Sequence, residues 1–293
     1  MNNLAVSVSL KGAGVNKRIN LNCGKILLGT FSGLIFVFLV VPSVLTVPMS
    51  FSDTRFLVFP PRGFTLDWYQ KFLGDEQWIG PTLFSLRLAI LTTFVSLILG
   101  FLASLALVRG SLPGRKFLHI LFISPIMIPV IIVAFAVYGI YAKFRMIGST
   151  TGLVLAHTIY TTPFVILVIS ANLYRFDSTL EMAARNLGAS AIQTYLLITL
   201  PLIKTGIISS GIFCFIMSLD ELILVMFLIG TKRLNLPMKM FSQLQFRLDP
   251  VVAAASTVFI VLAFAIIFSL AFLRRERKKV PATKEVGNEY PEG

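Results

Sequence analysis

The chain has 293 residues, of which 56% are hydrophobic and only 13% are charged, and its mean hydropathy is +0.85. A soluble globular domain cannot cover so much apolar surface, so the composition excludes that class and predicts an all-α integral membrane protein. The formal net charge of +13 is attributed to membrane topology and contact with anionic lipid, because no basic helix interleaved with exposed aromatics predicts nucleic-acid binding.

Six apolar runs are long enough to form membrane-spanning helices, which need roughly 20 residues each. None shows the ten-residue alternation that is typical of a barrel strand. The sequence therefore predicts one six-helix domain over residues 26–273, preceded by a cytoplasmic segment (1–25) and followed by a cytoplasmic basic tail (274–293). The six runs cover residues 26–49, 83–108, 117–141, 152–174, 205–229 and 251–273.

The first run leaves one alternative open. It follows Lys17, Arg18 and Lys25 and could be a cleaved signal peptide, but it is about twice as long as the usual apolar part of a signal sequence. We therefore expect the first run to be a span.

Orientation is predicted from the basic residues of the loops, which are retained on the cytoplasmic side. The decisive cluster follows the sixth run and comprises Arg274, Arg275, Arg277, Lys278 and Lys279. With an even number of spans, both termini and the loop around Arg109, Arg115 and Lys116 are then cytoplasmic.

Some basic residues fall on the predicted outer side. Arg87 lies near the outer end of the second run, where a long side chain can reach the lipid headgroups. The outer loop after the fifth run runs against the positive-inside rule. Its basic residues are Lys232, Arg233, Lys239 and Arg247.

Three prolines within the third and fourth runs predict bends, since a proline removes a backbone hydrogen bond. They are Pro125, Pro129 and Pro163. His157 in the fourth run is more often a core histidine than a ligand, and contact with substrate is kept as the alternative. Cys23 and Cys214 form no metal-spaced set and predict no disulfide or metal site.

The loop at residues 175–204 predicts two short helices joined by a glycine. Ser178 and Glu181 have the spacing of a capping box, and Gly188 suits the left-handed residue that ends a helix. Ser190 and Gln193 repeat the capping spacing, and that second helix is expected to end near Leu200, before Pro201.

The first of these helices carries a small apolar face made by Leu180, Ala183, Ala184 and Leu187. On the local pattern alone, this face either packs on the protein's own helices or receives a partner.

The same loop resembles the EAA signature of ATP-binding cassette importer permeases. The matching residues are Ala183, Ala184, Gly188, Ile198, Leu200 and Pro201. Met182 stands where the signature has glutamate, and Glu181 lies one place earlier. The resemblance implies that this loop is the coupling helix, which docks in a groove of the ATPase subunit. For Glu181 the choice stays open between that contact and the capping box.

Further stretches are similar to the polyamine, opine and aminoalkylphosphonate branch of these permeases. They are residues 63–69, 124–129, 157–163 and 218–221. The resemblance implies a multi-pass subunit of the bacterial inner membrane, with a different homologous permease chain, two ATPase subunits and an extracytoplasmic solute-binding protein as partners. ATP and Mg²⁺ would then be bound by the ATPase, and this chain would hold no cofactor.

Asp220 and Glu221 fall inside the fifth apolar run, where an ionised group is a functional candidate by default. One hypothesis is that Asp220 offers a carboxylate to an amine in the translocation pathway. The alternative is a structural pair or a gate. Two adjacent helical residues point about 100° apart, so both cannot line one narrow path.

The sequence favours one function over two alternatives. The first is an importer subunit for a polyamine such as putrescine or spermidine, with opines, aminoalkylphosphonates or another small solute as alternatives. The chain has no Gly-x-x-x-x-Gly-Lys-Ser/Thr loop, so it must draw its energy from an ATPase partner. The second is an intramembrane enzyme, which the sequence disfavours because no catalytic motif is present. The third is an exporter or channel, which would leave the cytoplasmic helix pair unexplained.

Overall fold

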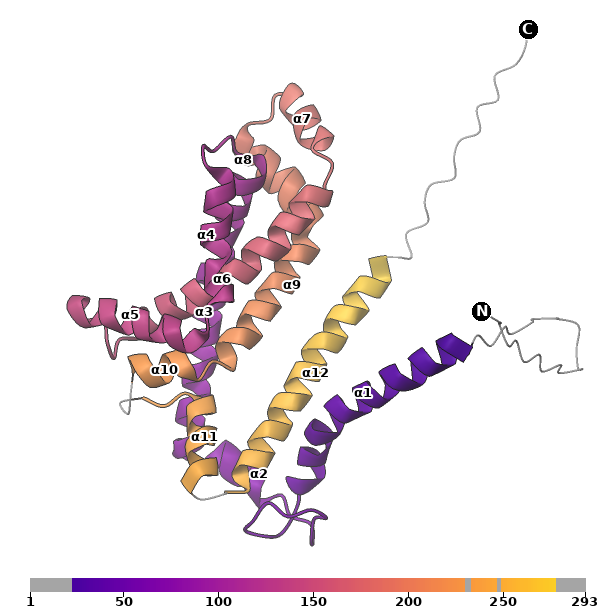
Figure 1. The fold of residues 1–293 in the computed structure, drawn as a ribbon, viewed down its shortest axis with the longest axis vertical. Coiled ribbons are helices and arrows are strands. Elements are labelled where there is room, and N and C mark those ends of the chain that lie inside the picture. The colour runs from indigo at the N-terminus through magenta and orange to yellow at the C-terminus, as the bar shows by residue number, and fades with distance from the viewer. Residues whose placement is uncertain (1–22, 230–232, 247–248, 278–293) are drawn as a thin grey trace, which may run out of the picture. The chain divides into compact units, whose positions relative to one another are not determined.

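The computed structural model describes residues 23–229, 233–246 and 249–277, and this part of the chain is helical, with no β-strand. It divides into two compact units, one formed by both ends of the chain and one by residues 73–247. Figure 1 shows the helices of both.

The first unit contains α1 (Cys23–Met49) and α12 (Val251–Arg277), which pack against each other, and most of α2 (Asp67–Gly74). The segment after α1 folds back, since the Trp68 indole N–H donates to the Ser52 carbonyl at 2.8 Å. Lys71 of α2 forms an ion pair with Asp249 just before α12, at 3.4 Å.

The second unit is built around three helices, α3 (Glu76–Arg109), α6 (Thr150–Arg175) and α9 (Leu200–Leu219), which pack against one another in pairs. The Ser96 and Thr161 hydroxyls lie 2.8 Å apart between α3 and α6, so polar side chains satisfy each other within the bundle. The other elements of this unit are α4 (Arg115–Met127), α5 (Val130–Phe144), α7 (Thr179–Asn186), α8 (Ala191–Thr194), a turn of π-helix η1 (Tyr195–Thr199), α10 (Ile223–Leu228) and α11 (Leu236–Phe246).

The sequence predicted the third apolar run as one span bent at its prolines, but the run forms two separate helices. It forms α4 and α5, whose axes differ by 107°. Ile128 at the break is extended (φ −96°, ψ 130°), as expected for a residue before proline, and Pro129 cannot donate the hydrogen bond that would continue the helix. The bend expected at Pro129 is therefore a break, whereas Pro125 lies inside α4 without ending it.

The fifth apolar run also differs from its prediction at both ends. The helix does not stop before Pro201: α8, η1 and α9 form one continuous helix over Ala191–Leu219. The Leu200 N–H bonds to the Tyr195 carbonyl, five residues back, and this wider turn accommodates a proline without ending the helix. At the other end the helix stops at Leu219, and α10 begins only at Ile223.

Four helices of the described residues have the length and hydropathy to cross a membrane, or five if α4 and α5 together form one span. They are Ile26–Met49, Glu76–Arg109, Thr150–Arg175 and Ala191–Leu219. The first, second and fourth predicted runs are thus confirmed as helices, and α12 covers the sixth. The count of six spans stays a prediction, and residues 1–22 and 278–293 of the predicted terminal segments lie outside the described residues.

The contact between α3 and α6 gives a test of the bundle. A Cβ on Gly100 would lie 2.5 Å from Val165 Cγ1, and Val165 is completely buried. We expect Gly100→Ala to destabilise this unit by about 1–3 kcal/mol through overpacking, and to lower the unfolding temperature of the detergent-solubilised chain.

Gly139 is the matched control, because a Cβ on this glycine of α5 would have open space around it. Gly139→Ala should leave the unfolding temperature unchanged or raise it slightly. Equal unfolding temperatures for the two variants would contradict the close α3–α6 contact.

Candidate functional site

The signature loop folds as the helix pair α7–α8 at one end of the second unit, opposite the end that carries α11 (Figure 1). Helix α7 is not started by the predicted capping box, because the Ser178 side chain makes no cap hydrogen bond. Asp177 takes that place: its Oδ1 accepts from the Thr179 backbone N–H at 2.9 Å and from the Thr179 hydroxyl at 2.6 Å. These bonds hold the pKa of the Asp177 carboxyl below its usual value, so the cap is lost only at acidic pH, as the pH falls through that lowered pKa.

The glycine joint between the two helices is as predicted. Gly188 has φ +92°, the Ala189 N–H bonds to the Ala184 carbonyl, and the Gly188 N–H bonds to the Arg185 carbonyl, which together form a Schellman motif. The second capping box is also confirmed: the Ser190 N–H donates to the Gln193 side chain at 2.8 Å, and the Gln193 N–H donates to Ser190 Oγ at 3.3 Å.

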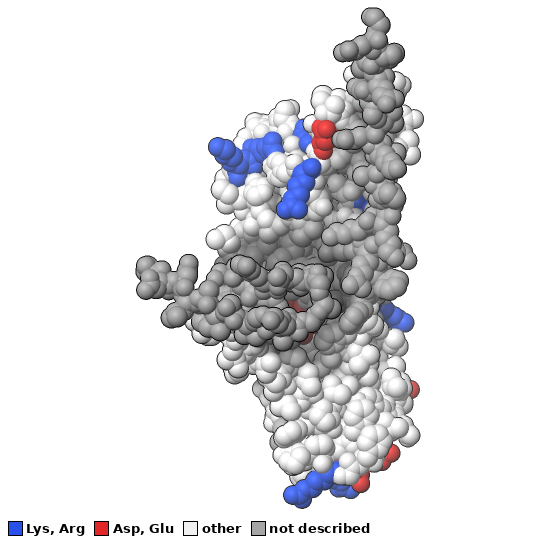
Figure 2. All heavy atoms as spheres, turned by 90° about the vertical axis from the view of Figure 1, so that its right-hand side faces the viewer, with Lys and Arg blue, Asp and Glu red and all other residues white. Residues whose placement is uncertain are grey.

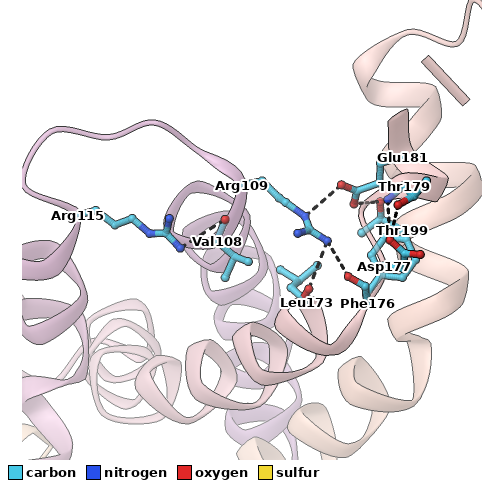
Figure 3. A network of polar contacts seen from close by, with 9 residues as sticks. All are labelled: Val108, Arg109, Arg115, Leu173, Phe176, Asp177, Thr179, Glu181 and Thr199. Carbon is cyan, nitrogen blue, oxygen red and sulfur yellow. Dashed lines mark hydrogen bonds and ion pairs between the residues drawn. The ribbon is translucent and has the colours of Figure 1, made fainter. Parts of the chain in front are cut away.

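Glu181 is directed into the protein (Figure 3). It is only 8% exposed, and its carboxylate lies 3.0 Å from Arg109 Nε, with the Thr199 hydroxyl donating to its other oxygen at 2.8 Å. Because both oxygens are engaged, the side chain cannot return to the start of α7, which explains why the predicted capping box fails.

Arg109 is the last residue of α3, and its guanidinium reaches two further elements, α7 and the C-terminal end of α6 (Figure 3). Its Nη2 donates to the carbonyls of Leu173 and Phe176 at 3.3 and 3.4 Å, and it lies 5.6 Å from the centre of the Phe176 ring. The last carbonyls of a helix have no partner within the helix and carry partial negative charge, so a cation at the end of α6 is stabilised there. We call the set Arg109, Glu181 and Thr199 the strut.

The opposite side of α7 and the start of α8 present apolar side chains to the outside. Leu187 is 89% exposed, and Ala183 is exposed while Ala184 is half-buried. We call this set the α7–α8 apolar surface; it consists of Leu180, Met182, Ala183, Leu187 and Ile192. Several exposed apolar side chains grouped on one short helix pair outside the apolar spans are typical of a surface that receives a partner.

The remaining signature residues have another place. Ile198 lies in η1, and Leu200 and Pro201 begin α9. They shape the turn that connects the α7–α8 pair to the bundle and do not belong to its apolar surface.

Asp220 and Glu221 do not lie inside a helix, as the sequence predicted, but in the break between α9 and α10. Glu221 Oε1 accepts from the backbone N–H groups of Ile223 and Leu224 at 2.8 and 3.0 Å, so it caps α10. The Asn235 side chain donates to the Glu221 carbonyl at 2.7 Å. Asp220 is exposed, so of the pair it alone presents a free surface to a ligand.

His157 is fully buried, and its Nδ1 lies 2.9 Å from Ser218 Oγ, so it joins α6 to α9 inside the bundle. The partner of His157, Ser218, lies two residues before Asp220, whereas the α7–α8 pair lies at the opposite end of α9.

Sequence reasoning missed Asp177, Arg109 and Thr199. Arg109 was assigned only to a basic loop, because nothing in the local pattern links it to a glutamate far along the chain. The sequence signal that could have found the strut is the acidic residue displaced by one position from the signature.

Charged side chains on the visible face of the protein lie in small patches, and most of the described surface between them is uncharged (Figure 2). This distribution agrees with helices that face lipid.

The strut can be tested by separating its ion pair from its hydrogen bond. Glu181→Gln keeps an acceptor for Thr199 but leaves the Arg109 guanidinium without a countercharge. We expect this to lower the free energy of undocking of α7 by on the order of 3 kcal/mol, and to speed amide hydrogen exchange at 180–187 on the order of 100-fold.

Thr199→Val, which removes only the hydroxyl bond, should cost about 1 kcal/mol. The double variant with Arg109→Gln and Glu181→Gln should be less destabilised than the sum of the single variants. Unchanged exchange in Glu181→Gln would show that the ion pair does not hold α7.

Residues 96–279 match the family described as binding-protein-dependent transport system inner membrane component. The chain is 26% identical over 259 residues to the spermidine/putrescine transport system permease protein PotC of Escherichia coli (strain K12), covering 87% of this chain and 97% of PotC. It is 31% identical over 230 residues to the putrescine transport system permease protein PotI of the same strain, covering 76% of this chain and 82% of PotI.

Among solved structures, a bacterial ABC transporter involved in the import of the acidic polysaccharide alginate matches with a TM-score of 0.66 at 15% identity, covering 92% of this chain and 100% of that chain. At this identity the match shows the fold alone. The family match covers more than half of the sequence, and the helical fold agrees with it. The chain is therefore a transport subunit, not an enzyme, and belongs to the family of inner membrane components of binding-protein-dependent transport systems.

Proposed function

We propose that this subunit moves a polyamine, such as putrescine or spermidine, inward across the cytoplasmic membrane by alternating access, driven by ATP hydrolysis in a separate ATPase. The names of the permeases PotC and PotI support this substrate class. The lack of a phosphate-binding loop in the sequence supports a separate source of energy.

The observation that carries the proposal is the α7–α8 apolar surface. Burial of an exposed leucine such as Leu187 contributes about 1.5–3 kcal/mol to an interface, and Ala183 lets a partner surface approach closely. Glu181 is buried in the strut, so the position nearest to the signature glutamate on the outside is Met182, which is exposed. The contact with the ATPase is accordingly apolar here, where the family signature places a charge.

The strut gives the docking helix a rigid connection to the bundle. A displacement of α7 by the ATPase acts through Glu181 on Arg109 at the end of α3, and through Arg109 on the carbonyls at the end of α6. These two helices pack along each other, so both would move with α7. Alternating access needs such a mechanical link between nucleotide state and helix position.

The proposed assembly contains this chain, a different homologous permease chain, two ATPase subunits that bind ATP and Mg²⁺, and an extracytoplasmic solute-binding protein. Both termini and the α7–α8 pair lie in the cytoplasm, as the basic cluster after the sixth run predicts. Opines, aminoalkylphosphonates and other small solutes are the alternative substrates.

Docking can be tested by cysteine crosslinking. In a chain with Cys23 and Cys214 replaced by Ala, we expect Leu187→Cys and Ala184→Cys to crosslink to a cysteine in the groove of the ATPase in native membranes. The yield should change when ATP is added, because the groove moves with nucleotide state.

Leu244→Cys is the control, because Leu244 is exposed on α11 at the other end of the unit. It should give no crosslink to the ATPase. If an assembled complex gives no crosslink from any position of residues 180–188, the α7–α8 pair is an ordinary surface element and the proposed coupling is wrong.

The substrate contact is tested separately by Asp220→Asn. If the exposed carboxylate attracts an ammonium group, uptake of labelled putrescine should fall by about tenfold, in line with the loss of one charge-assisted hydrogen bond. Asp75→Asn is the control, because it removes a carboxylate charge at the start of α3 and not at the break that carries Asp220. Normal putrescine uptake by Asp220→Asn, at normal membrane level and assembly, would remove Asp220 from the pathway.

A further inference from the structure

A cleft of about 670 Å³ lies at the end of α3 that is opposite to Arg109. Its walls come from the first turns of α3, from the segment that leads into α11 and from the first turn of α11. Gln77, Leu83, Phe84 and Arg87 line it from α3, and Arg233 and Lys239 line it from the other side. The cleft thus combines an apolar wall with three cationic side chains.

Lys239 is the buried member of this group. It is only 8% exposed, and its Nζ has the Gln77 amide oxygen at 3.4 Å and the Trp78 ring at 5.6 Å from the ring centre. A weak amide contact and an aromatic face stabilise an ammonium only in part, and removal of a charge from water is costly unless an opposite charge lies close.

No described residue that lines the cleft is an aspartate or a glutamate. The ion pairs of the described residues lie elsewhere, at Lys71–Asp249 and Arg109–Glu181. Among the described residues, Arg233 donates to the Thr150 hydroxyl at 3.4 Å. The described part of this chain therefore gathers positive charge here without supplying the negative charge that would balance it.

The depth of the cleft along α3 indicates where a countercharge would come from. The 34 residues of α3 extend about 50 Å, whereas the hydrocarbon core is about 30 Å thick. If the helix is centred, roughly seven residues at each end project into the headgroup layer. The cleft begins within those residues at Gln77 and continues to Arg87, whose long side chain can reach back to the headgroups.

We propose that this cleft binds a phosphate oxyanion, supplied by the headgroup of an anionic phospholipid. The three cations contact the phosphate, and Leu83 and Phe84 lie beside the first acyl carbons. A polyamine is repelled from the same cleft, so the cleft is separate from the proposed substrate path. The site also gives a role to Arg233 and Lys239, basic residues that the positive-inside rule would not place on the outer side.

The test is native mass spectrometry of the full-length chain in mild detergent, titrated with phosphatidylglycerol or with phosphatidylcholine. We expect one phosphatidylglycerol adduct to survive at low lipid concentration and phosphatidylcholine to bind more weakly. Lys239→Gln and Arg87→Gln should each weaken the phosphatidylglycerol adduct by about fivefold, and Lys239→Arg should retain it. The thermal unfolding of each variant, measured in parallel, separates lost binding from a misfolded chain.

Lys143→Gln is the matched control, because Lys143 is an exposed cation on α5 and lies outside the cleft. If inorganic phosphate at millimolar concentration displaces the lipid and binds the delipidated chain alone, the oxyanion site is supported and its source is a free anion. Equal phosphatidylglycerol binding by Lys239→Gln, Arg87→Gln and Lys143→Gln would overturn the proposal.

Discussion

The contact between the Arg109 guanidinium and the Glu181 carboxylate is the constraint on which the position of the α7–α8 helix pair depends. A guanidinium half withdrawn from water needs an anion and several acceptors, and this one finds them on α7 and at the C-terminal end of α6. Arginine suits the position because its planar fork can serve a carboxylate at Nε and two carbonyls at Nη2 together, which a lysine cannot do. The ends of α3 and α6 and the start of α7 are therefore fixed by one side chain.

This contact also explains why one side of α7 is bound to the protein and the other side is apolar and exposed. A short helix of eight residues is not stable by itself in water, so it must be held by tertiary contacts. Glu181 supplies that contact on the inner side, and the outer side is left free to be apolar. A carboxylate at position 182 would point outward and could not replace Glu181 in the strut. The displaced acidic residue is thus a consequence of where α7 is anchored.

The first, second, fourth and sixth apolar helices and the glycine joint could be predicted from the sequence, because hydrophobic run length and the left-handed preference of glycine are local properties. The effect of each proline could not. Pro129 ends α4, Pro163 is contained in α6, and Pro201 is absorbed by a turn of π-helix. Proline always removes a hydrogen bond, but the surrounding packing decides whether the helix breaks, bends or widens.

The partners of the buried carboxylates also could not be predicted from the local sequence. The spacing of Glu181 to Ser178 predicted a cap, yet Arg109, far away in the sequence, takes the carboxylate, and Asp177 caps the helix instead. Glu221 lies in a break that hydrophobicity alone could not reveal, because the residues on both sides of it are apolar. For such groups the residue type predicts that a partner must exist, and only the fold shows which one it is.

Helix α3 has basic side chains toward both of its ends, and their surroundings differ. At Arg109 the protein supplies its own anion, so the charge is balanced within the chain and can transmit force between helices. At Arg87 and Lys239 the described chain supplies only an amide oxygen and an aromatic ring, and the proposed phospholipid headgroup would supply the balancing charge. A cation that is paired internally is suited to hold a helix in place, whereas a set of cations without an internal anion is suited to bind something. The two ends of one helix therefore have different roles, even though their basic residues look alike in the sequence.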